Sequence, residues 1–259
     1  MLSFNEIKRH YTNRENNLPQ LVLKEYLQYK ILDIIFSSPY GEKLSFMGGT
    51  AIRIVYGSDR FSEDLDLDNQ SLTKKDFEKL IDYIKRELER DGLEVEFRNT
   101  FQDVYHCYLR FPKILFENKI SPLKDEKIMI RLDSFSTKIS DKTIIKVISK
   151  ADVFAEIRVY PKELILAQKI EALFNRKRSK GRDIYDIVYL LSFTNPNYEY
   201  LNDKLNISDK KDLIGKMKNL FSESDLKSLA KDVKPFLIDS RKIIQIEKFN
   251  LWLEDFLKR

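Results

Sequence analysis

Two stretches decide the fold: Phe46-Met-Gly-Gly-Thr-Ala-Ile-Arg53 and Arg60-Phe-Ser-Glu-Asp-Leu-Asp-Leu-Asp68. In the first, a short apolar run leads into two glycines and a threonine. In the second, three aspartates alternate with leucines, so on an extended strand the acidic side chains emerge on one face. Like charges on one face repel each other unless a cation lies among them. The two stretches therefore predict a metal and phosphate site.

The glycine pair Gly48-Gly49 predicts a place where an anion approaches the backbone. Residues Lys43–Met47 are expected to form a strand, and Thr50 to cap a helix over Ala51–Tyr56. Glycine permits the backbone conformations that a bulky anion requires, and a helix N-terminus adds free N–H groups and a positive dipole end. Turns also use glycine pairs routinely, so the pair alone does not decide between a turn and a phosphate site.

Aspartates supply the second part of the predicted site. Asp64 and Asp66 offer the oxygen ligands that Mg²⁺ prefers, and two such ions stabilise the attacking and leaving oxygens of phosphoryl transfer. A solvent-facing acidic loop is the alternative, but the alternating leucines give this strand a core face. Asp133 ends the apolar strand Ile128–Leu132 and is expected to complete a carboxylate triad. Asp68 leaves a rival metal pair, Asp66 with Asp68.

The later part of the chain adds candidate residues on helices. Lys169 lies in the apolar stretch Leu164–Leu173, where a lone cation either snorkels to the surface or contacts a triphosphate. Asp183 and Asp186 are three apart on one helical face, although acids in a first turn are also ordinary dipole partners. Between these groups, Arg176–Arg182 holds five cations in seven positions. Such a patch suits phosphate, but from charge alone a solvated helix end is the simpler interpretation.

Hydrophobic periodicity predicts an α+β fold. A mixed sheet with flanking helices is expected over residues 1–160, and a helical bundle over residues 161–259. Helices are expected over Leu18–Phe36, Lys162–Arg178, Arg182–Phe193, Ser208–Phe221, Ser222–Val233 and Arg241–Leu257, with a further one opened by the capping box Thr73-Lys-Lys-Asp76. Strands are expected over Asp64–Asp68, Leu93–Arg98, Val104–Phe111, Ile114–Glu117, Lys127–Phe135, Thr143–Ile148 and Phe154–Val159.

Composition excludes several classes of protein. A chain of 259 residues with 42% hydrophobic residues supports a substantial core. Its net charge of +5 does not by itself indicate a nucleic-acid binder. One cysteine and two histidines cannot form an internal disulfide or an ordinary zinc cluster. No apolar run approaches a membrane span and no signal peptide is recognised, so a cytoplasmic protein without membrane contact is expected.

Several sequence blocks, in a fixed order along the chain, resemble a known family. The Gly-Gly-Thr turn, Arg60-x-Ser-x-Asp-Leu-Asp66 and Asp133 resemble the DNA polymerase β-type nucleotidyltransferase signature. Leu166–Leu173 and Lys180–Ile187 make the chain similar to the AbiEii/AbiGii-type toxins of type IV toxin–antitoxin systems. The resemblance covers roughly residues 43–191. It implies Mg²⁺, a nucleoside triphosphate (NTP) substrate and, as in some relatives, addition of nucleotides to the 3′ end of tRNA.

The resemblance also implies a role for each matching residue. The residues that it assigns to nucleotide binding are Gly48, Gly49, Thr50, Arg60, Ser62, Lys169, Arg182 and Asp183. For Arg60, bracing the loop is the alternative to a phosphate contact. Those that it assigns to two Mg²⁺ ions are Asp64, Asp66 and Asp133. Those that it assigns to catalysis are Asp64, Asp66, Asp133, Lys169 and Asp186.

The function expected from the sequence is Mg²⁺-dependent transfer of a nucleoside monophosphate from an NTP to RNA, at the 3′ end of tRNA, which blocks translation. Two alternatives stay open. One is nucleotidylation of a protein or small molecule. The other is a nucleotide-binding partner of an antitoxin without turnover. A cognate antitoxin is expected, but whether it binds the toxin directly, or acts on Ser62, stays open.

Overall fold

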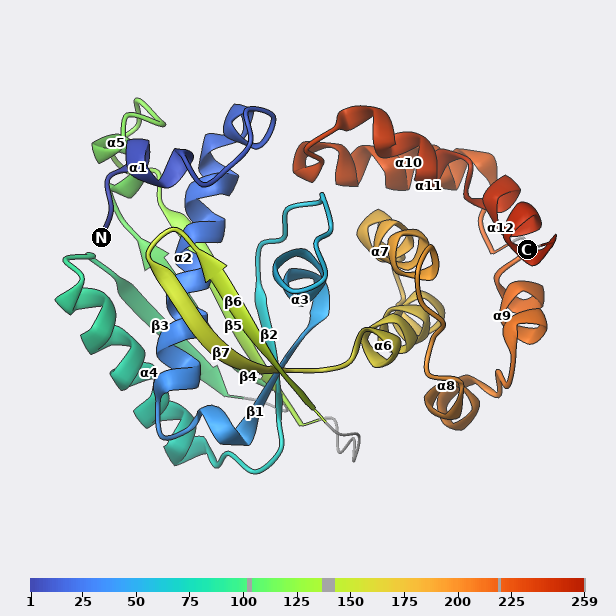
Figure 1. The fold of residues 1–259 in the computed structure, drawn as a ribbon, viewed down its shortest axis with the longest axis horizontal. Coiled ribbons are helices and arrows are strands. Elements are labelled where there is room, and N and C mark those ends of the chain that lie inside the picture. Colours follow the sequence, from blue (N-terminus) through green and yellow to red (C-terminus); the bar gives the residue numbers. More distant parts are fainter. Residues whose placement is uncertain (102–103, 137–142, 219, 259) are drawn as a thin grey trace. The chain divides into compact units, whose positions relative to one another are not determined.

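The computed structural model describes residues 1–101, 104–136, 143–218 and 220–258. The chain forms two compact units. Unit 1 comprises residues 1–55 and 61–160, and unit 2 comprises residues 56–60 and the chain from Pro161 onward. A mixed sheet with helices in unit 1, and helices in unit 2, confirm the expected α+β class (Figure 1).

Unit 1 is built on a sheet whose seven described strands lie in the order β3-β4-β5-β2-β1-β7-β6. The strands are β1 (Leu44–Met47), β2 (Leu65–Asn69), β3 (Glu96–Phe101), β4 (Tyr105–Phe111), β5 (Ile128–Phe135), β6 (Ile144–Lys150) and β7 (Val153–Val159). The pairs β2/β5 and β1/β7 are parallel, and the other neighbours are antiparallel. The glycine turn, which follows β1, and the aspartates of β2 therefore lie in the middle of the sheet.

Helices pack on this sheet and on each other. They are α1 (Phe4–Lys8), α2 (Pro19–Ser37), α3 (Gly48–Ile54), α4 (Lys74–Arg90) and α5 (Ile114–Glu117), with 3₁₀ turns at Glu15–Asn17 and Gly41–Lys43. Helix α2 contacts β7, β5 and α4, and α3 contacts β1 and β2 (Figure 1). The capping box of Thr73 and Asp76 opens α4 as predicted, and the apolar stripe of α4 is buried.

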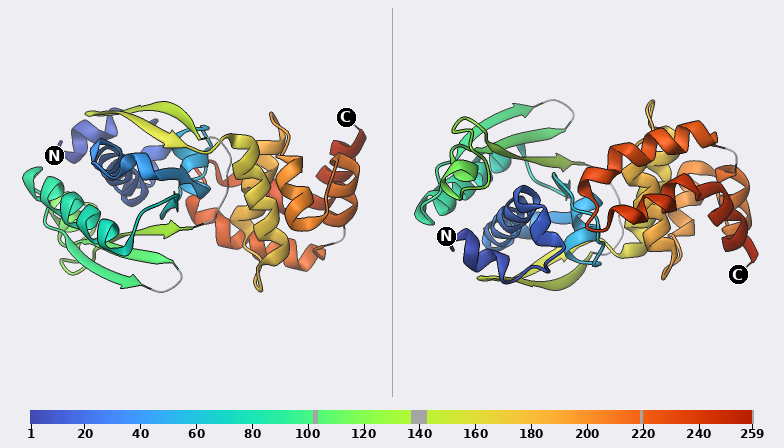
Figure 2. Two further views of the ribbon diagram at one scale, coloured as in Figure 1. Left: turned by 90° about the horizontal axis from the view of Figure 1, so that it is seen from below. Right: turned by 90° about the horizontal axis from the view of Figure 1, so that it is seen from above.

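Unit 2 is helical (Figure 2). Its helices are α6 (Lys162–Asn175), α7 (Gly181–Leu191), α8 (Tyr198–Leu205), α9 (Lys210–Met217), α10 (Glu223–Val233), α11 (Ile244–Glu247) and α12 (Phe249–Lys258), with 3₁₀ turns at Lys234–Phe236 and Ser240–Ile243. Helix α7 is central, because it contacts α6, α10 and α11. A Cβ on Gly181 would lie 2.0 Å from the carbonyl oxygen of Leu229, so glycine is required where α7 meets α10.

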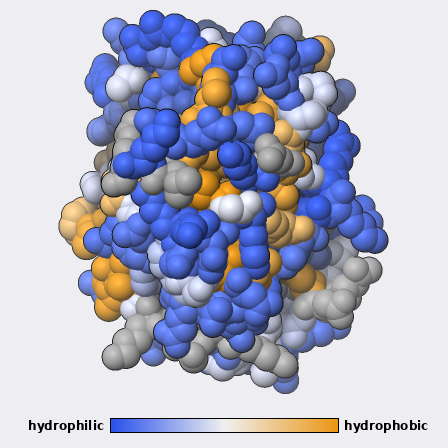
Figure 3. All heavy atoms as spheres, turned by 90° about the vertical axis from the view of Figure 1, so that its right-hand side faces the viewer, coloured by the Kyte–Doolittle hydropathy of each residue, from blue (hydrophilic) through white to orange (hydrophobic). Residues whose placement is uncertain are grey.

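Hydrophilic side chains dominate the face drawn in Figure 3, and apolar side chains show between them. Exposed apolar residues of unit 2 include Leu251 and Phe193, whose exposed fractions are 60% and 48%. No helix within the described ranges has the length and apolar character needed to span a lipid bilayer.

Two predictions about unit 1 are wrong. Residues 114–117 form helix α5 and not a strand, because Lys113 takes the left-handed conformation (φ 58°) after β4 and ends the extended chain. Thr50 is not a helix cap, because α3 already begins at Gly48. The Thr50 hydroxyl instead donates a hydrogen bond to the backbone carbonyl of Asp64.

The prediction of one C-terminal helix over Arg241–Leu257 is also wrong. The chain there forms a 3₁₀ turn, α11 and α12 in succession. The side chain of Asp239 caps the 3₁₀ turn, and Lys248 leaves helical geometry (φ −107°) between α11 and α12. Helices α1 and α8 were not predicted, since each is shorter than about three turns and carries a weak periodic signal.

Candidate active site

The predicted carboxylates of unit 1 come from two neighbouring parallel strands, β2 and β5. Their register pairs Asp66 with Asp133. Directly paired residues of adjacent strands point to the same face of a sheet, so these two carboxylates lie side by side. Asp64 comes one residue before β2, and its Oδ2 lies 3.0 Å from Nη2 of Arg131 on β5. The sheet therefore brings together the three aspartates proposed as metal ligands.

Gly48 lies against the carboxylate of Asp66. Its φ of 76° is one that other residues rarely adopt, and a Cβ at this position would lie 2.1 Å from Oδ2 of Asp66. Gly49 and Thr50 follow in the first turn of α3, and both are buried. Because the Thr50 hydroxyl binds the carbonyl of Asp64, the start of α3 is tied to the segment that leads into β2. The glycine turn and the aspartate strand thus form one local structure.

Arg131 is a site residue that the sequence analysis missed. Besides Asp64, it contacts Asp133, whose Oδ2 lies 3.0 Å from its Nε. Partial burial lowers the pKa of Arg131, but the carboxylates of Asp64, Asp133 and Asp66 raise it above its usual value. Because side chains two apart on a strand share a face, the position of Arg131 two residues before Asp133 is the signal that could have found it.

Asp133 is buried and has a second partner, His106 of β4. The Nδ1 atom of His106 lies 2.7 Å from Oδ1 of Asp133, because the antiparallel register of β4 and β5 places the two residues opposite each other. Sequence reasoning did not connect them, since no spacing along the chain relates residues on separate strands.

The neighbouring Cys107 points into the core, and burial raises its pKa to about 12, so it is a thiol and not a nucleophile at neutral pH.

Two further polar residues of the aspartate motif have structural partners. Asp68 is buried in the core and accepts a 2.6 Å hydrogen bond from the hydroxyl of Tyr160. The backbone carbonyl of Ser62 accepts a 3.1 Å hydrogen bond from Nε2 of Gln28 on α2. Asp68 therefore has a clear role in linking β2 to the end of β7, apart from any metal.

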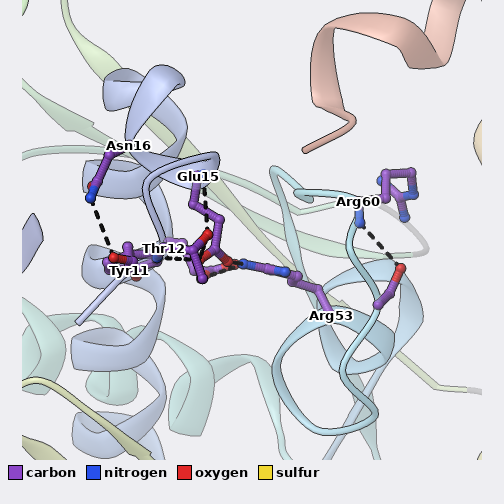
Figure 4. Close-up of polar contacts among 8 residues, drawn as sticks. Tyr11, Thr12, Glu15, Asn16, Arg53 and Arg60 are labelled. Carbon is purple, nitrogen blue, oxygen red and sulfur yellow. Dashed lines mark hydrogen bonds and ion pairs between the residues drawn. The ribbon is translucent and has the colours of Figure 1, made fainter. Parts of the chain in front are cut away.

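A buried ion cluster fixes the far end of α3. The Arg53 guanidinium donates to Glu15 at 2.5 Å, and its Nε donates to Glu25 of α2 at 2.6 Å. Figure 4 shows Arg53 reaching Glu15, whose carboxylate also accepts hydrogen bonds from the backbone and hydroxyl of Thr12. The Arg53 guanidinium lies over the ring of Phe61, with its Cζ 4.6 Å from the ring centroid. The helix that carries the glycine turn is thus anchored to the N-terminal segment.

The carboxylate set of unit 1 suits Mg²⁺ in its donor chemistry, since it offers only oxygen ligands. Among the described residues, no group of three or more His, Cys, Asp or Glu side chains is arranged to hold a metal ion as it stands. A cation is nevertheless accommodated here, because the Arg131 guanidinium pairs with Asp64 and Asp133 and is attracted to Asp66. The residues therefore fit the charge and chemistry of a divalent ion.

Unit 2 contains the remaining predicted residues. The chain leaves unit 1 after Val55, and residues 56–60 belong to unit 2. Arg60 there forms two parallel hydrogen bonds of 2.9 Å with the carboxylate of Asp186, and both side chains are buried. Two tyrosines of α7 hold the same segment, because Tyr185 donates to Asp59 and Tyr189 donates to the carbonyl of Tyr56. The hydroxyls of both tyrosines therefore bind segment 56–60.

Lys169 lies inside the same network. Its Nζ is 2.9 Å from Oδ2 of Asp186 and 3.0 Å from Oδ1 of Asp183, and Asp183 also binds Arg176 at 2.5 Å. Burial lowers the pKa of Lys169, but the two aspartates raise it above its usual value. For Asp186, burial raises the pKa, but the positive charges of Arg60 and Lys169 lower it by more. The net pKa of Asp186 is below its usual value. Lys169 and Asp186 are therefore both charged at neutral pH.

The basic patch divides between two environments. Arg176, Lys177, Arg178 and Lys180 are exposed on the segment between α6 and α7, whereas Arg182 is half-buried in the first turn of α7. Arg176 is partly engaged by Asp183. The exposed members leave a cationic surface on unit 2.

Comparison with known proteins places the chain in a family. A family profile described as "Nucleotidyl transferase AbiEii toxin, Type IV TA system" matches residues 30–247. The chain belongs to this family. It is a nucleotidyltransferase toxin of the type IV toxin–antitoxin class, as the sequence predicted. Its family implies an NTP substrate and a cognate antitoxin.

Solved structures share the fold of this chain. MenT4, a nucleotidyltransferase toxin from Mycobacterium tuberculosis H37Rv, aligns with a TM-score of 0.59 at 16% identity, covering 100% of this chain and 99% of that chain. JHP933 from Helicobacter pylori aligns with a TM-score of 0.56 at 19% identity, covering 92% and 94%. No protein of curated function matches the sequence.

Proposed function

We propose that this toxin transfers a nucleoside monophosphate from an NTP to the 3′ end of a tRNA. The observation that carries the proposal is the pairing of Asp66 with Asp133 across β2 and β5, with Gly48 against Asp66. Carboxylates beside a glycine turn at a helix N-terminus suit an NTP with its metal, because backbone N–H groups bind phosphate and carboxylates bind the ion.

Asp64, Asp66 and Asp133 are the residues that would hold Mg²⁺. When bound, the ion would offset the negative charge that develops on the transferring phosphate. Gly48, Gly49 and Thr50 would bind the phosphates through the start of α3, and the glycine at position 48 lets the Asp66 carboxylate approach this turn closely. Asp133 would orient the attacking hydroxyl and accept its proton.

The reaction joins the 3′-hydroxyl oxygen of the RNA to the α-phosphorus of the NTP. The bond from the α-phosphorus to the bridging oxygen of the β-phosphate breaks, and pyrophosphate leaves with its electron pair. The exposed cations between α6 and α7 would bind the RNA backbone, which predicts a salt-dependent affinity. An increase in salt that left RNA binding unchanged would argue against this part of the proposal.

The contributions proposed from unit 2 are Lys169, Arg182, Asp183 and Asp186, with Arg60 as a brace. Arg60 holds the segment that runs on into Ser62 and Asp64, which supports a bracing role. Lys169 is paired with Asp183 and Asp186, so binding a triphosphate would require it to leave at least one of them.

The test is transfer of label from α-labelled NTPs to total RNA in the presence of Mg²⁺. We expect label in tRNA from the wild-type protein and none from Asp66→Asn, because the amide loses the charge that binds the metal. Asp68→Asn is the matched control: the amide oxygen still accepts the hydrogen bond from Tyr160, and activity should persist. An inactive Asp68→Asn beside an active Asp66→Asn would show that the wrong pair has been assigned. Label in protein alone would exclude the RNA acceptor.

A further inference from the structure

Arg131 has contacts that the proposed chemistry does not yet use. It lies on β5 two residues before Asp133, and its guanidinium bridges two of the three aspartates. Nη2 lies 3.0 Å from Oδ2 of Asp64, and Nε lies 3.0 Å from Oδ2 of Asp133. Nε is buried, but the side chain as a whole keeps an exposed fraction of 35%, so Arg131 lies at the edge of the core and not inside it.

A divalent cation and this guanidinium compete for the same oxygens. Oδ2 of Asp64 and Oδ2 of Asp133 both face Arg131. An ion bound by these carboxylates would take up that charge and repel the guanidinium, since like charges a few ångströms apart in a partly buried site oppose each other strongly. Arg131 must therefore give up at least one carboxylate when the metal binds.

A released guanidinium next to an NTP has an obvious acceptor. The planar fork of arginine matches phosphate oxygens as well as it matches carboxylates. Gly48, the start of the proposed phosphate turn, lies against Asp66, which is itself among the carboxylates that attract Arg131. A triphosphate bound at this turn would thus place its negative charge near Arg131, the residue that the metal displaces.

We propose that Arg131 neutralises the aspartates until a divalent cation binds, and then binds the phosphates of the NTP. This inference rests on the proposed metal and phosphate site. It makes Arg131 a substrate-binding residue whose pairing with the carboxylates keeps the site from accumulating negative charge before the metal arrives.

The test measures two affinities of Arg131→Gln. Binding of Mn²⁺ alone, followed by its paramagnetic resonance signal, should become about tenfold tighter because a competing cation is gone. Binding of a non-hydrolysable NTP analogue at saturating Mn²⁺ should become about tenfold weaker because a charged phosphate ligand is gone. Arg158→Gln, on β7 and so two strands from β2, is the matched control and should change neither affinity.

The opposite signs separate this proposal from its rivals. A residue with a purely structural role would weaken both affinities. A mere competitor of the metal would strengthen Mn²⁺ binding and leave analogue binding at saturating Mn²⁺ unchanged. Either result overturns the proposal. Arg131→Lys retains the charge without the fork, so it should keep the wild-type Mn²⁺ affinity while weakening analogue binding, and it decides the question if the glutamine variant does not fold. A wild-type protein that binds no Mn²⁺ would refute the proposed metal site itself, whereas wild-type binding with unchanged variants would refute only the role of Arg131.

Discussion

Gly48 has the least tolerant position among the proposed site residues. Its φ is 76°, and a Cβ added there would lie 2.1 Å from Oδ2 of Asp66, so any side chain is excluded. We expect Gly48→Ala to lower nucleotide transfer by about 100-fold or more, because a shift of about 1 Å in a catalytic group costs that much. The measurement is the initial rate of label transfer at saturating NTP.

Gly92 provides the control for backbone strain. It has a similar φ of 80°, but nothing lies within 4 Å of a Cβ built there. Gly92→Ala should therefore lower the free energy of unfolding by about 1–2 kcal/mol with unchanged transfer activity. Equal losses of activity in the two variants would mean that strain, and not the displacement of Asp66, inactivates Gly48→Ala.

At the scale of elements, α3 depends on its ion cluster with the N-terminal segment. Glu15 and Glu25 precede the region that the family profile matches, residues 30–247, whereas Arg53 lies within it. Arg53→Met would leave two carboxylates without their cation, at an expected cost of about 3–5 kcal/mol in the free energy of unfolding. Arg86→Met on the exposed face of α4 should cost under about 0.5 kcal/mol. Urea unfolding of both variants measures the difference.

The effect of Arg53→Met should depend on pH. Burial raises the pKa of Glu15, but hydrogen bonds from Arg53 and Thr12 lower it by more. The net pKa of Glu15 is therefore below its usual value of 4.5. A lowered folded pKa means that the stabilisation is present above the unfolded value and is lost as the pH falls through the folded value. The stability difference between wild type and Arg53→Met should therefore be largest at neutral pH and shrink on acidification below 4.5. A constant difference would show that Glu15 does not depend on Arg53.

Patterns within single strands and helices predict only part of this site. Alternation along one strand suffices to place Asp64 and Asp66 on one face, and a capping box suffices to begin α4. Alternation along β5 could also have placed Arg131 on the face of Asp133. His106 lies beyond such reasoning, because it meets Asp133 through the register of a separate strand. Local backbone conformation is equally difficult to predict. Lys113 takes the left-handed conformation, and the apolar run that follows it forms α5 and not a strand.

For the whole molecule, the segment 56–60 is the feature that sequence could not predict. It lies between the glycine turn and the aspartate strand in the chain, yet it belongs to unit 2. The reason is a pairing across 126 positions, in which Arg60 binds Asp186. Neither residue's neighbours in sequence signal this contact, since a buried arginine is recognised only by the carboxylate that folding brings to it. An arginine assigned to phosphate by resemblance therefore proves to be engaged within a buried core.

Removing that arginine should loosen unit 2 locally. Arg60→Met leaves Asp186 with Lys169 as its charged partner, and breaking a buried pair costs about 3–5 kcal/mol. Hydrogen exchange should therefore accelerate by about 100-fold or more for amides of α7 that exchange through local opening. Arg178→Met, an exposed cation between α6 and α7, should leave these amides unchanged. Unaltered exchange in α7 would contradict the anchoring role, and equal acceleration in every element, including the strands of unit 1, would show a global loss of stability instead of a local one.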